Sequence, residues 1–444
     1  MPLRGGQEPR RQDGPRRHHQ AARRAQAVHA GHRVKLSREE NAILEGRLGA
    51  GARKAMEILT ALGALSGSPD MVEVRSVQVS GVSYANIGEH GLAFLEAWAA
   101  QGSRAVVPAF MNPGGADRRL WRSLGYPAAF VRKQNQVIAA LEKLGVQPTL
   151  TCTPYHCGQT PAFGQHLAWA ESSAVCFANS VAGARTNREG GPSAIAAALT
   201  GRTPRHTLHT DEGRRPTRLV EVGCRVKSVA DAGALGYLIG KLVSEDPKGG
   251  VPYIVGVEPP DGPMRLTWLK ALGAAMAASG SVGLYHLDRV TPEAVACGRA
   301  LASRLAKRSV VAGLQDGHRA LGTGRGAADL VAIGCPHASP DDLRHIAGLL
   351  KGRRVKTPLW IFVASDVRRQ AKKDGSAAKL AKSGAILVSD TCIVVSPLKE
   401  LGVKTVATDS AKAAFYLPSH HGVGVHFGAT EDCVETALRG KHGA

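Results

Sequence analysis

"LVAIGCPHASPDDLRHIAGLLKGRRVKTPLWIFVAS" (residues 330–365) is the stretch that decides the class of fold. Its first apolar run predicts a buried strand, and the turn after that strand carries Cys335. Pro340 then opens a helical pattern that ends near Gly352, and a second apolar run follows over residues 358–363. Strand, helix and strand in this order are typical of a parallel sheet covered by helices.

The same alternation recurs along most of the 444-residue chain. Apolar runs such as "VPYIVGV" (251–257) alternate with helical patterns such as "RLTWLKALGAAMAASG" (265–280). We therefore expect an α/β fold with largely parallel sheets flanked by helices, in two or three domains. The N-terminal α/β region is predicted to span residues 34–225 and the C-terminal α/β region residues 226–444.

Charge is the unusual feature of the composition, because 57 basic residues oppose 36 acidic ones. Residues 1–33 contain eight arginines against Glu8 and Asp13 and few apolar residues, so this segment is predicted to be a disordered basic arm. A nucleic-acid-binding protein is therefore a distant alternative, although aromatic residues do not interleave the basic ones. The positive charge of the remaining chain suits a small anionic substrate equally well.

The eight cysteines and the hydropathy pattern indicate a soluble protein of a reducing compartment, which we expect to be the cytoplasm. No apolar run approaches the roughly 18 residues that a membrane-spanning helix needs. The arginine-rich start lacks the apolar stretch of a secretory signal. No pair of cysteines has the spacing C-x-x-C, which excludes zinc-ribbon and ferredoxin patterns.

Three cysteines share one kind of position. Cys152 in "PTLTC", Cys335 in "AIGC" and Cys392 in "AILVSDTC" each lie just past the carboxyl end of a predicted buried strand. In open α/β sheets the loops at this edge converge and bind ligands. Three thiolates from three loops could hold an iron–sulfur cluster and leave one iron free for substrate oxygen. A single cysteine at a strand end is usually a core residue, so placement alone leaves a metal site open.

Several blocks of the sequence resemble the aconitase X family, specifically its large subunit. These blocks are "TCTPY" (151–155), "FGQHLAWAESSAVCFANSVAGARTNREGGPSAIAAALTGRTP" (163–204), "IGCPHAS" (333–339), "SDTC" (389–392) and "SAKAAFYLP" (410–418). The resemblance runs from about residue 35 to residue 430 in order. Three shorter blocks, "GVSY" (81–84), "MNP" (111–113) and "ARTNREGGP" (184–192), look like the branch of the family that dehydrates phosphomevalonate.

The resemblance implies an aconitase-like fold without the swivel domain, which a separate small subunit would supply because the chain stops after "DCVETALRGKHGA". It places the ligands of an iron–sulfur cluster, most simply 4Fe-4S, on Cys152, Cys335 and Cys392. It also implies a set of substrate contacts, namely Gly81, Val82, Ser83, Asn112, Pro113, Glu171, Ser172, Ser410 and Lys412. Two residues depart from the family, since Gln78 stands where relatives usually have His and Asp409 where they usually have Asn.

The implied reaction is the removal of water from (R)-5-phosphomevalonate, giving anhydromevalonate phosphate. Dehydration of cis-3-hydroxy-L-proline is the alternative within the family. Lys412 is the candidate to bind a substrate anion, and the general base is expected on the small subunit. Glu171 is the fallback acid or base on this chain, provided that burial raises its pKa. Ion pairs of Arg185, Arg188 and Glu189 are expected to fix the wall of the pocket, and whether Arg185 or Arg188 contacts the ligand or only Glu189 stays open. His337 is expected to make a supporting hydrogen bond rather than bind metal.

Overall fold

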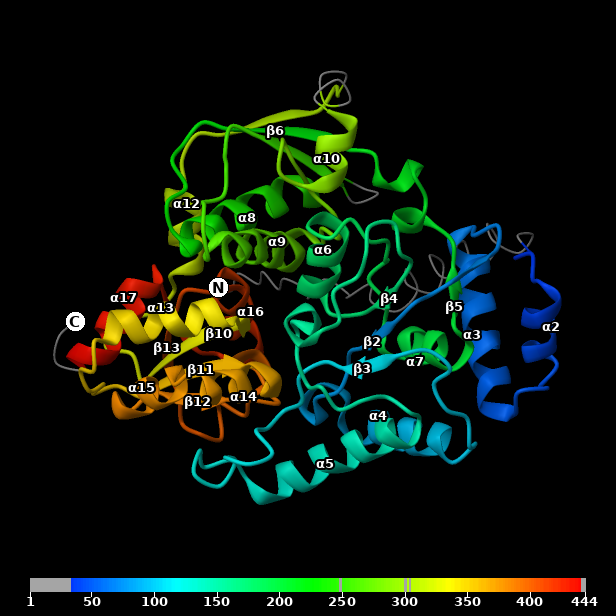
Figure 1. Cartoon of the computed structure of the whole chain (residues 1–444), viewed down its shortest axis with the longest axis horizontal. Helices are drawn as coiled ribbons and strands as arrows, with labels where there is room; N and C mark the ends of the chain where they lie inside the picture. Colours follow the sequence, from blue (N-terminus) through cyan, green and yellow to red (C-terminus); the bar gives the residue numbers. More distant parts are fainter. Residues whose placement is uncertain (1–32, 247–249, 299–301, 303–304, 441–444) are drawn as a thin grey trace, which may run out of the picture.

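The computed structural model describes residues 33–246, 250–298, 302 and 305–440 (Figure 1). The predicted basic arm therefore lies outside the described residues, apart from Arg33. The described chain forms three parallel sheets of three, four and five strands and one antiparallel strand pair, all flanked by helices. The predicted α/β class with largely parallel sheets is confirmed. Among the described helices, none combines the length and the apolar character that crossing a membrane requires.

The first part of the chain is built around the three-stranded sheet, whose strand order is β3–β2–β4. Its strands are β2 (Val77–Val79), β3 (Ala109–Met111) and β4 (Ala168–Trp169), and the antiparallel pair joins β1 (Met71–Glu73) to β5 (Arg202–Pro204). The helices of this part are α2 (Arg38–Leu44), α3 (Ala50–Ser66), α4 (Tyr84–Ala99), α5 (Ala128–Lys143), α6 (Ser172–Ser180) and α7 (Gly191–Thr200). Helix α2 begins with a capping box, in which the side chains of Ser37 and Glu40 accept from each other's backbone N–H groups.

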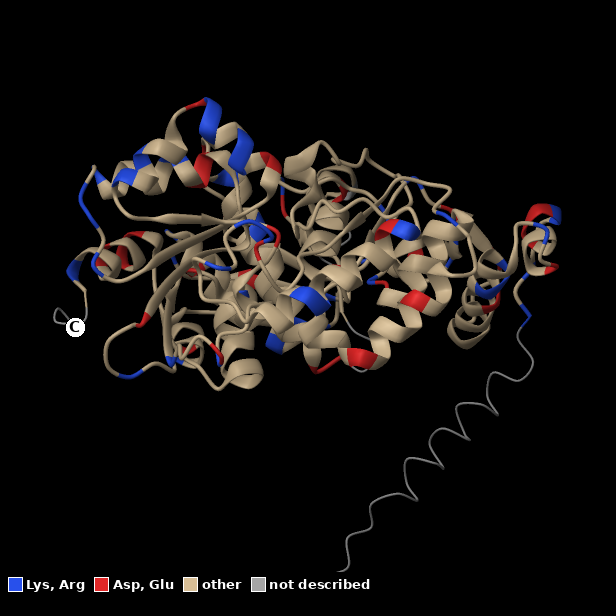
Figure 2. Ribbon diagram, turned by 90° about the horizontal axis from the view of Figure 1, so that it is seen from below, with Lys and Arg blue, Asp and Glu red and all other residues tan. Residues whose placement is uncertain are grey.

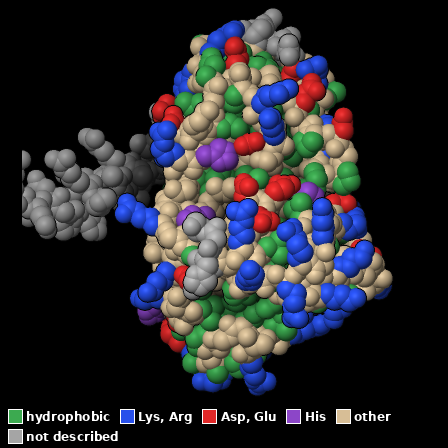
Figure 3. Space-filling model, turned by 90° about the vertical axis from the view of Figure 1, so that its left-hand side faces the viewer, with side chains coloured by type: hydrophobic (Ala, Val, Ile, Leu, Met, Phe, Trp, Pro, Cys, Tyr) green, Lys and Arg blue, Asp and Glu red, His purple; other side chains and the backbone are tan. Residues whose placement is uncertain are grey.

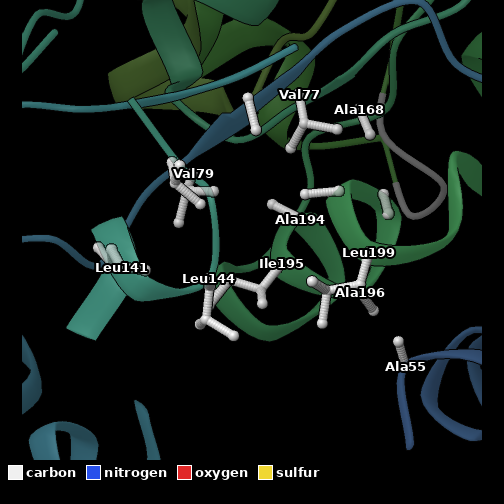
Figure 4. Packing of buried hydrophobic residues seen from close by; sticks show 14 of the residues in the cluster. Ala55, Val77, Val79, Leu141, Leu144, Ala168, Ala194, Ile195, Ala196 and Leu199 are labelled. Atoms are coloured by element: carbon white, nitrogen blue, oxygen red, sulfur yellow. The ribbon is translucent and has the colours of Figure 1, made fainter. Parts of the chain in front are cut away.

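Alternation along β2 gives this sheet two different faces. Val77 and Val79 are fully buried against α3, α5 and α7, and Leu144 and Ile195 lie in the same cluster (Figure 4). On the other face, Phe110 of β3 and Trp169 of β4 pack with helix α6. The second face is therefore covered by the helix that follows Glu171, and this packing fixes where that residue lies.

The second part contains the four-stranded sheet in the order β8–β7–β6–β9. Its strands are β6 (Arg218–Val222), β7 (Pro252–Val255), β8 (His286–Leu287) and β9 (Arg308–Val311). Helices α8 (Val229–Ser244) and α9 (Arg265–Gly280) pack closely on each other beneath this sheet in Figure 1, and α10 (Pro292–Cys297) and α12 (Gln315–Leu321) complete the part. Helix α9 also packs on α6 and on α16, so it connects all three parts of the chain.

The third part is the five-stranded sheet in the order β12–β11–β10–β13–β14. Its strands are β10 (Leu330–Ala338), β11 (Leu359–Val363), β12 (Ile386–Val388), β13 (Thr405–Thr408) and β14 (Gly424–Phe427). The flanking helices are α13 (Pro340–Leu350), α14 (Ser365–Lys373), α15 (Ser376–Lys382), α16 (Ala411–His421) and α17 (Thr430–Arg439). Strands β10 and β11 pair in parallel around α13, as the opening stretch predicts.

Two of the predicted cysteine positions differ in detail from the structure. The segment before Cys152 forms no regular strand; a single bridge joins Gln147 to Phe110, and the Thr151 N–H donates to the Met111 carbonyl at 3.2 Å. Cys335 lies inside β10, where the pairing with β11 is interrupted between Ile333 and Ala338. The interruption follows from Gly334, which has a φ of +97° and lies so close to the backbone of Phe362 that a Cβ would meet its carbonyl oxygen at 2.3 Å.

Basic and acidic residues are distributed over all parts of the described chain (Figure 2). On the face drawn in Figure 3, Lys and Arg side chains outnumber acidic ones, but acidic and apolar side chains lie among them. The positive charge of the folded part is therefore dispersed on this face, which gives no support to the nucleic-acid alternative.

Candidate functional site

The three selected cysteines line one cavity of about 320 Å³. Cys152 follows the segment beside β3, Cys335 lies at the interruption of β10, and Cys392 follows β12. Cys152 and Cys335 are buried, Cys392 is half-buried, and all three are free thiols. The fold thus brings together three thiols that are separated by 183 and by 57 residues in the sequence.

His337 connects the loops that carry these cysteines. Its Nε2 lies 2.9 Å from the Thr391 carbonyl and its Nδ1 lies 3.0 Å from the Thr151 hydroxyl. Burial lowers the pKa of His337 to about 4, so the ring is neutral, with Nε2 donating to the carbonyl and Nδ1 accepting from the hydroxyl. The backbone N–H of His337 also donates to the sulfur of Cys152 at 3.2 Å. Both ring nitrogens of His337 are therefore engaged in hydrogen bonds. This geometry gives His337 a supporting role and not a metal-binding one.

The thiols stand in a buried environment with a cation nearby. Burial raises the pKa of Cys392 to about 12, and it also raises the pKa values of Cys152 and Cys335, while the Lys412 ammonium acts in the opposite direction on all three. A bound metal deprotonates thiols that would otherwise stay neutral at physiological pH.

The donor set fits an iron–sulfur cluster better than a single metal ion. Within the described residues, no three His, Cys, Asp or Glu side chains converge on a point where one ion could be held. An iron–sulfur cluster binds each thiolate through a different iron, so its cysteines surround a volume instead of a point. Three cysteines around one cavity match this requirement, and thiolates are the preferred ligands of such clusters.

Lys412 and Glu171 form an ion pair at the floor of the cavity, with both side chains nearly buried. The Asn112 amide donates to the other carboxylate oxygen of Glu171 at 2.6 Å, and Glu171 also caps helix α6. Burial alone would raise the pKa of the Glu171 carboxyl, but the Lys412 ammonium and the hydrogen bonds from Lys412 and Asn112 lower it to about 2. The condition under which Glu171 could serve as acid or base, a pKa raised by burial, is therefore not met.

The other predicted substrate contacts divide into two groups. Gly81, Pro113 and Ser172 line the cavity together with Asn112, and Gly81 has a φ of +74°, which favours glycine at this turn. The remaining three lie behind the wall. Val82 belongs to the apolar core, Ser83 is buried with a hydroxyl that finds no partner in the described part of the chain, and Ser410 caps α16 and donates to the Cys335 carbonyl.

The two positions at which the resemblance implied a departure from the family also lie behind the cavity. Gln78 is fully buried on β2, where its amide donates to the Thr151 carbonyl at 3.2 Å and its Oε1 has no partner among the described residues. Asp409 accepts a hydrogen bond from the Thr430 hydroxyl at 2.7 Å. Burial raises the pKa of Asp409 to about 6, against the effect of this hydrogen bond.

The loop 184–192 is held differently from the expected network of ion pairs. Arg185 pairs with Asp211 and lines a different cavity, while the Glu189 carboxylate accepts hydrogen bonds from Ser193 and Thr203. The predicted pairing of Glu189 with the neighbouring arginines is therefore wrong. Arg188, by contrast, lines the cysteine cavity.

The sequence interpretation missed several residues at this cavity, namely Ser80, Asn86, Val394, Val395, Tyr416 and His420. For two of them a signal was available, because Tyr416 and His420 follow Lys412 at a spacing of four on one helix and so share its face.

The fold and the cavity define an α/β enzyme with a thiol-lined site. Family models match the chain at residues 33–212 (aconitase X first domain), 216–316 (second domain) and 328–439 (third domain). The chain therefore belongs to the aconitase X family. The solved structure of Thermococcus kodakaraensis aconitase X in its holo form has a TM-score of 0.83 and 39% identity, with 91% of this chain and 100% of that chain covered.

Two groups of relatives share this similarity. The phosphomevalonate dehydratase large subunit of Methanocaldococcus jannaschii is 42% identical over 406 residues, covering 90% of this chain and 99% of that protein. The corresponding subunit of Methanothermobacter thermautotrophicus is 43% identical, covering 88% and 96%. The cis-3-hydroxy-L-proline dehydratase of Pseudomonas aeruginosa is 37% identical, covering 95% of this chain and 73% of that protein.

Proposed function

We propose that this chain is the large subunit of a dehydratase that removes water from (R)-5-phosphomevalonate, working with a separate small subunit. The observation that carries the proposal is the joining of three cysteines and the Lys412–Glu171 pair around one cavity. The names of the more similar relatives support this substrate and, through the words "large subunit", the existence of a partner.

Cys152, Cys335 and Cys392 would hold the cluster, most simply 4Fe-4S. When bound, an iron–sulfur cluster with one iron free of protein ligands supplies a Lewis acid that turns a hydroxyl into a better leaving group. The residues of this chain bind and orient the anionic substrate around that position. The loops of Gly81 and Asn112 bring backbone and amide groups to the cavity wall. His337 keeps the cysteine loops together from behind.

Glu171 acts on Lys412 rather than on the substrate proton. Its pKa of about 2 makes it a weak base and leaves it without a proton to donate at neutral pH. Its charge keeps the buried Lys412 ammonium protonated, and Lys412 would bind a substrate anion. We therefore place the general base on the small subunit.

The second candidate is dehydration of cis-3-hydroxy-L-proline, which the similarity to the Pseudomonas aeruginosa enzyme favours. The decisive experiment co-expresses this chain with its small subunit, purifies the complex without oxygen and offers both substrates. We expect turnover of phosphomevalonate and none of hydroxyproline. Turnover of hydroxyproline alone would reverse the assignment.

The seven cysteines described are all free thiols, which supports a reducing, cytoplasmic location for such an oxygen-sensitive site.

A further inference from the structure

The charges that line the cysteine cavity are unevenly balanced. The Lys412 ammonium is neutralised by its ion pair with Glu171. Arg188 is the other permanent cation of the lining, and within the described chain no carboxylate lies close enough to pair with it. It is also exposed, whereas Lys412 is only 9% exposed. The cavity therefore has a neutralised cation at its floor and an unpaired one at its mouth.

The residues of helix α16 that line the cavity become more exposed from its floor to its mouth. Lys412, Tyr416 and His420 line the cavity from one face of this helix, and they are buried, half-buried and exposed in that order. Arg188, like His420, is an exposed residue of this lining, whereas Cys152 and Cys335 are buried residues of it. A ligand that reaches the thiols with one end can place its other end at the exposed part of the lining, which includes Arg188 and His420.

The backbone on both sides of Arg188 is fixed. Before it, the Asn187 side chain accepts from the Leu208 N–H at 3.0 Å and donates to the His206 carbonyl at 3.1 Å. After it, the Glu189 N–H donates to the Trp169 carbonyl at 3.0 Å, and the Glu189 carboxylate is held by two hydroxyls. The guanidinium is thus presented by a loop that is already ordered, which reduces the entropy lost on binding.

We propose that Arg188 binds the phosphate group of the substrate at the mouth of the cavity and thereby sets the preference for a phosphorylated substrate. The inference rests on the proposed function, since it assigns one end of that substrate. A guanidinium matches a phosphate with two parallel hydrogen bonds, and His420 can add a third donor. The carboxylate and the hydroxyl then lie toward Lys412 and the three cysteines.

The test compares Arg188→Gln and Arg188→Lys in the assembled complex of large subunit, small subunit and cluster. We expect Arg188→Gln to raise the KM for (R)-5-phosphomevalonate by about 10- to 100-fold, the usual effect of losing a charge-assisted hydrogen bond, while kcat changes far less. Arg188→Lys restores part of the loss. The matched control is Arg185→Gln, three residues earlier, which lines another cavity and should leave the KM unchanged. Iron content and melting temperature verify that Arg188→Gln is folded and loaded.

A KM for Arg188→Gln within about twofold of wild type would overturn the inference while the proposed function stands. If the wild-type complex does not turn over phosphomevalonate at all, the proposed function fails. In that event, the binding of inorganic phosphate to the same complexes decides whether Arg188 forms a phosphate site. Binding that is weakened at least about tenfold in Arg188→Gln supports a phosphate site at this residue. Equal binding, or none in the wild type, overturns it.

Discussion

The imidazole Nδ1 of His337 lies 3.0 Å from the hydroxyl oxygen of Thr151, the residue before Cys152. The other ring nitrogen lies 2.9 Å from the carbonyl of Thr391, the residue before Cys392. His337 itself follows Cys335 by two residues, so one side chain connects three loops that come from distant parts of the chain. A single buried ring therefore joins the segments that carry the three thiols.

Replacing His337 with Ala should weaken both the fold and the cluster site. The change leaves the Thr391 carbonyl buried without this partner, at a cost of about 1–3 kcal/mol, whereas the Thr151 hydroxyl loses one contact and keeps those with Thr153. We expect a lower free energy of unfolding in urea and less iron and sulfide per chain. His345→Ala, which removes a partly exposed pair with Glu431, is the control. Full iron content in His337→Ala would contradict the connecting role.

The cysteine assignment predicts a selective loss of metal. Single Cys→Ser changes at 152, 335 and 392 should each reduce iron and sulfide content and abolish turnover by the anaerobic complex, because serine is a poor ligand for such a cluster. Cys176→Ser and Cys433→Ser, at buried positions of α6 and α17, should keep the metal and lose only stability. Retention of all iron by Cys335→Ser or Cys392→Ser would show that the ligands are elsewhere.

The ion pair of Lys412 and Glu171 predicts a particular dependence of stability on pH. The folded pKa of Glu171, about 2, lies below its ordinary value of 4.5. Its contribution is therefore fully present above about pH 4.5 and is lost as the pH falls toward 2. Lys412→Met should cost about 3–5 kcal/mol at pH 7, because a buried carboxylate is left unpaired.

Because Lys412→Met also removes the cause of the lowered pKa, the difference in unfolding free energy between variant and wild type should shrink in acid. Urea unfolding at about five pH values between pH 3 and pH 7, one pH unit apart, measures this difference in unfolding free energy. Lys133→Met is the control, since Lys133 and Glu89 pair at the surface, where water and salt screen the interaction. A constant difference across this pH range would mean that the pair does not control the charge of Glu171.

The sequence predicted the features that depend on local pattern. Alternating apolar and helical runs identified the parallel sheets. Strand ends also pointed to the three cysteines that line the cavity. The lowered pKa of Glu171 escaped prediction, because its cause, Lys412, lies 241 residues further along the chain. For the same reason the partner of Arg185 was missed: Asp211 is reached only through the fold.

Asp409 predicts a dependence of stability on pH that is opposite to that of Glu171. The family resemblance places Asn at this position. Burial raises the folded pKa of Asp409 from 3.8 to about 6. A carboxyl with a raised pKa contributes stability that is fully present below its unfolded value of 3.8 and is lost as the pH rises through about 6. Asp409→Asn removes this loss and can still accept the hydrogen bond from Thr430.

We expect the Asp409→Asn variant to be more stable than wild type by about 1–3 kcal/mol at pH 8, and the two proteins to be nearly equally stable below about pH 4. Thermal unfolding at the two pH values measures the effect, with Asp432→Asn, on the exposed first turn of α17, as the control. Equal melting temperatures of wild type and Asp409→Asn at pH 8 would show that the buried carboxylate carries no cost, and that the departure from the family is neutral for the fold.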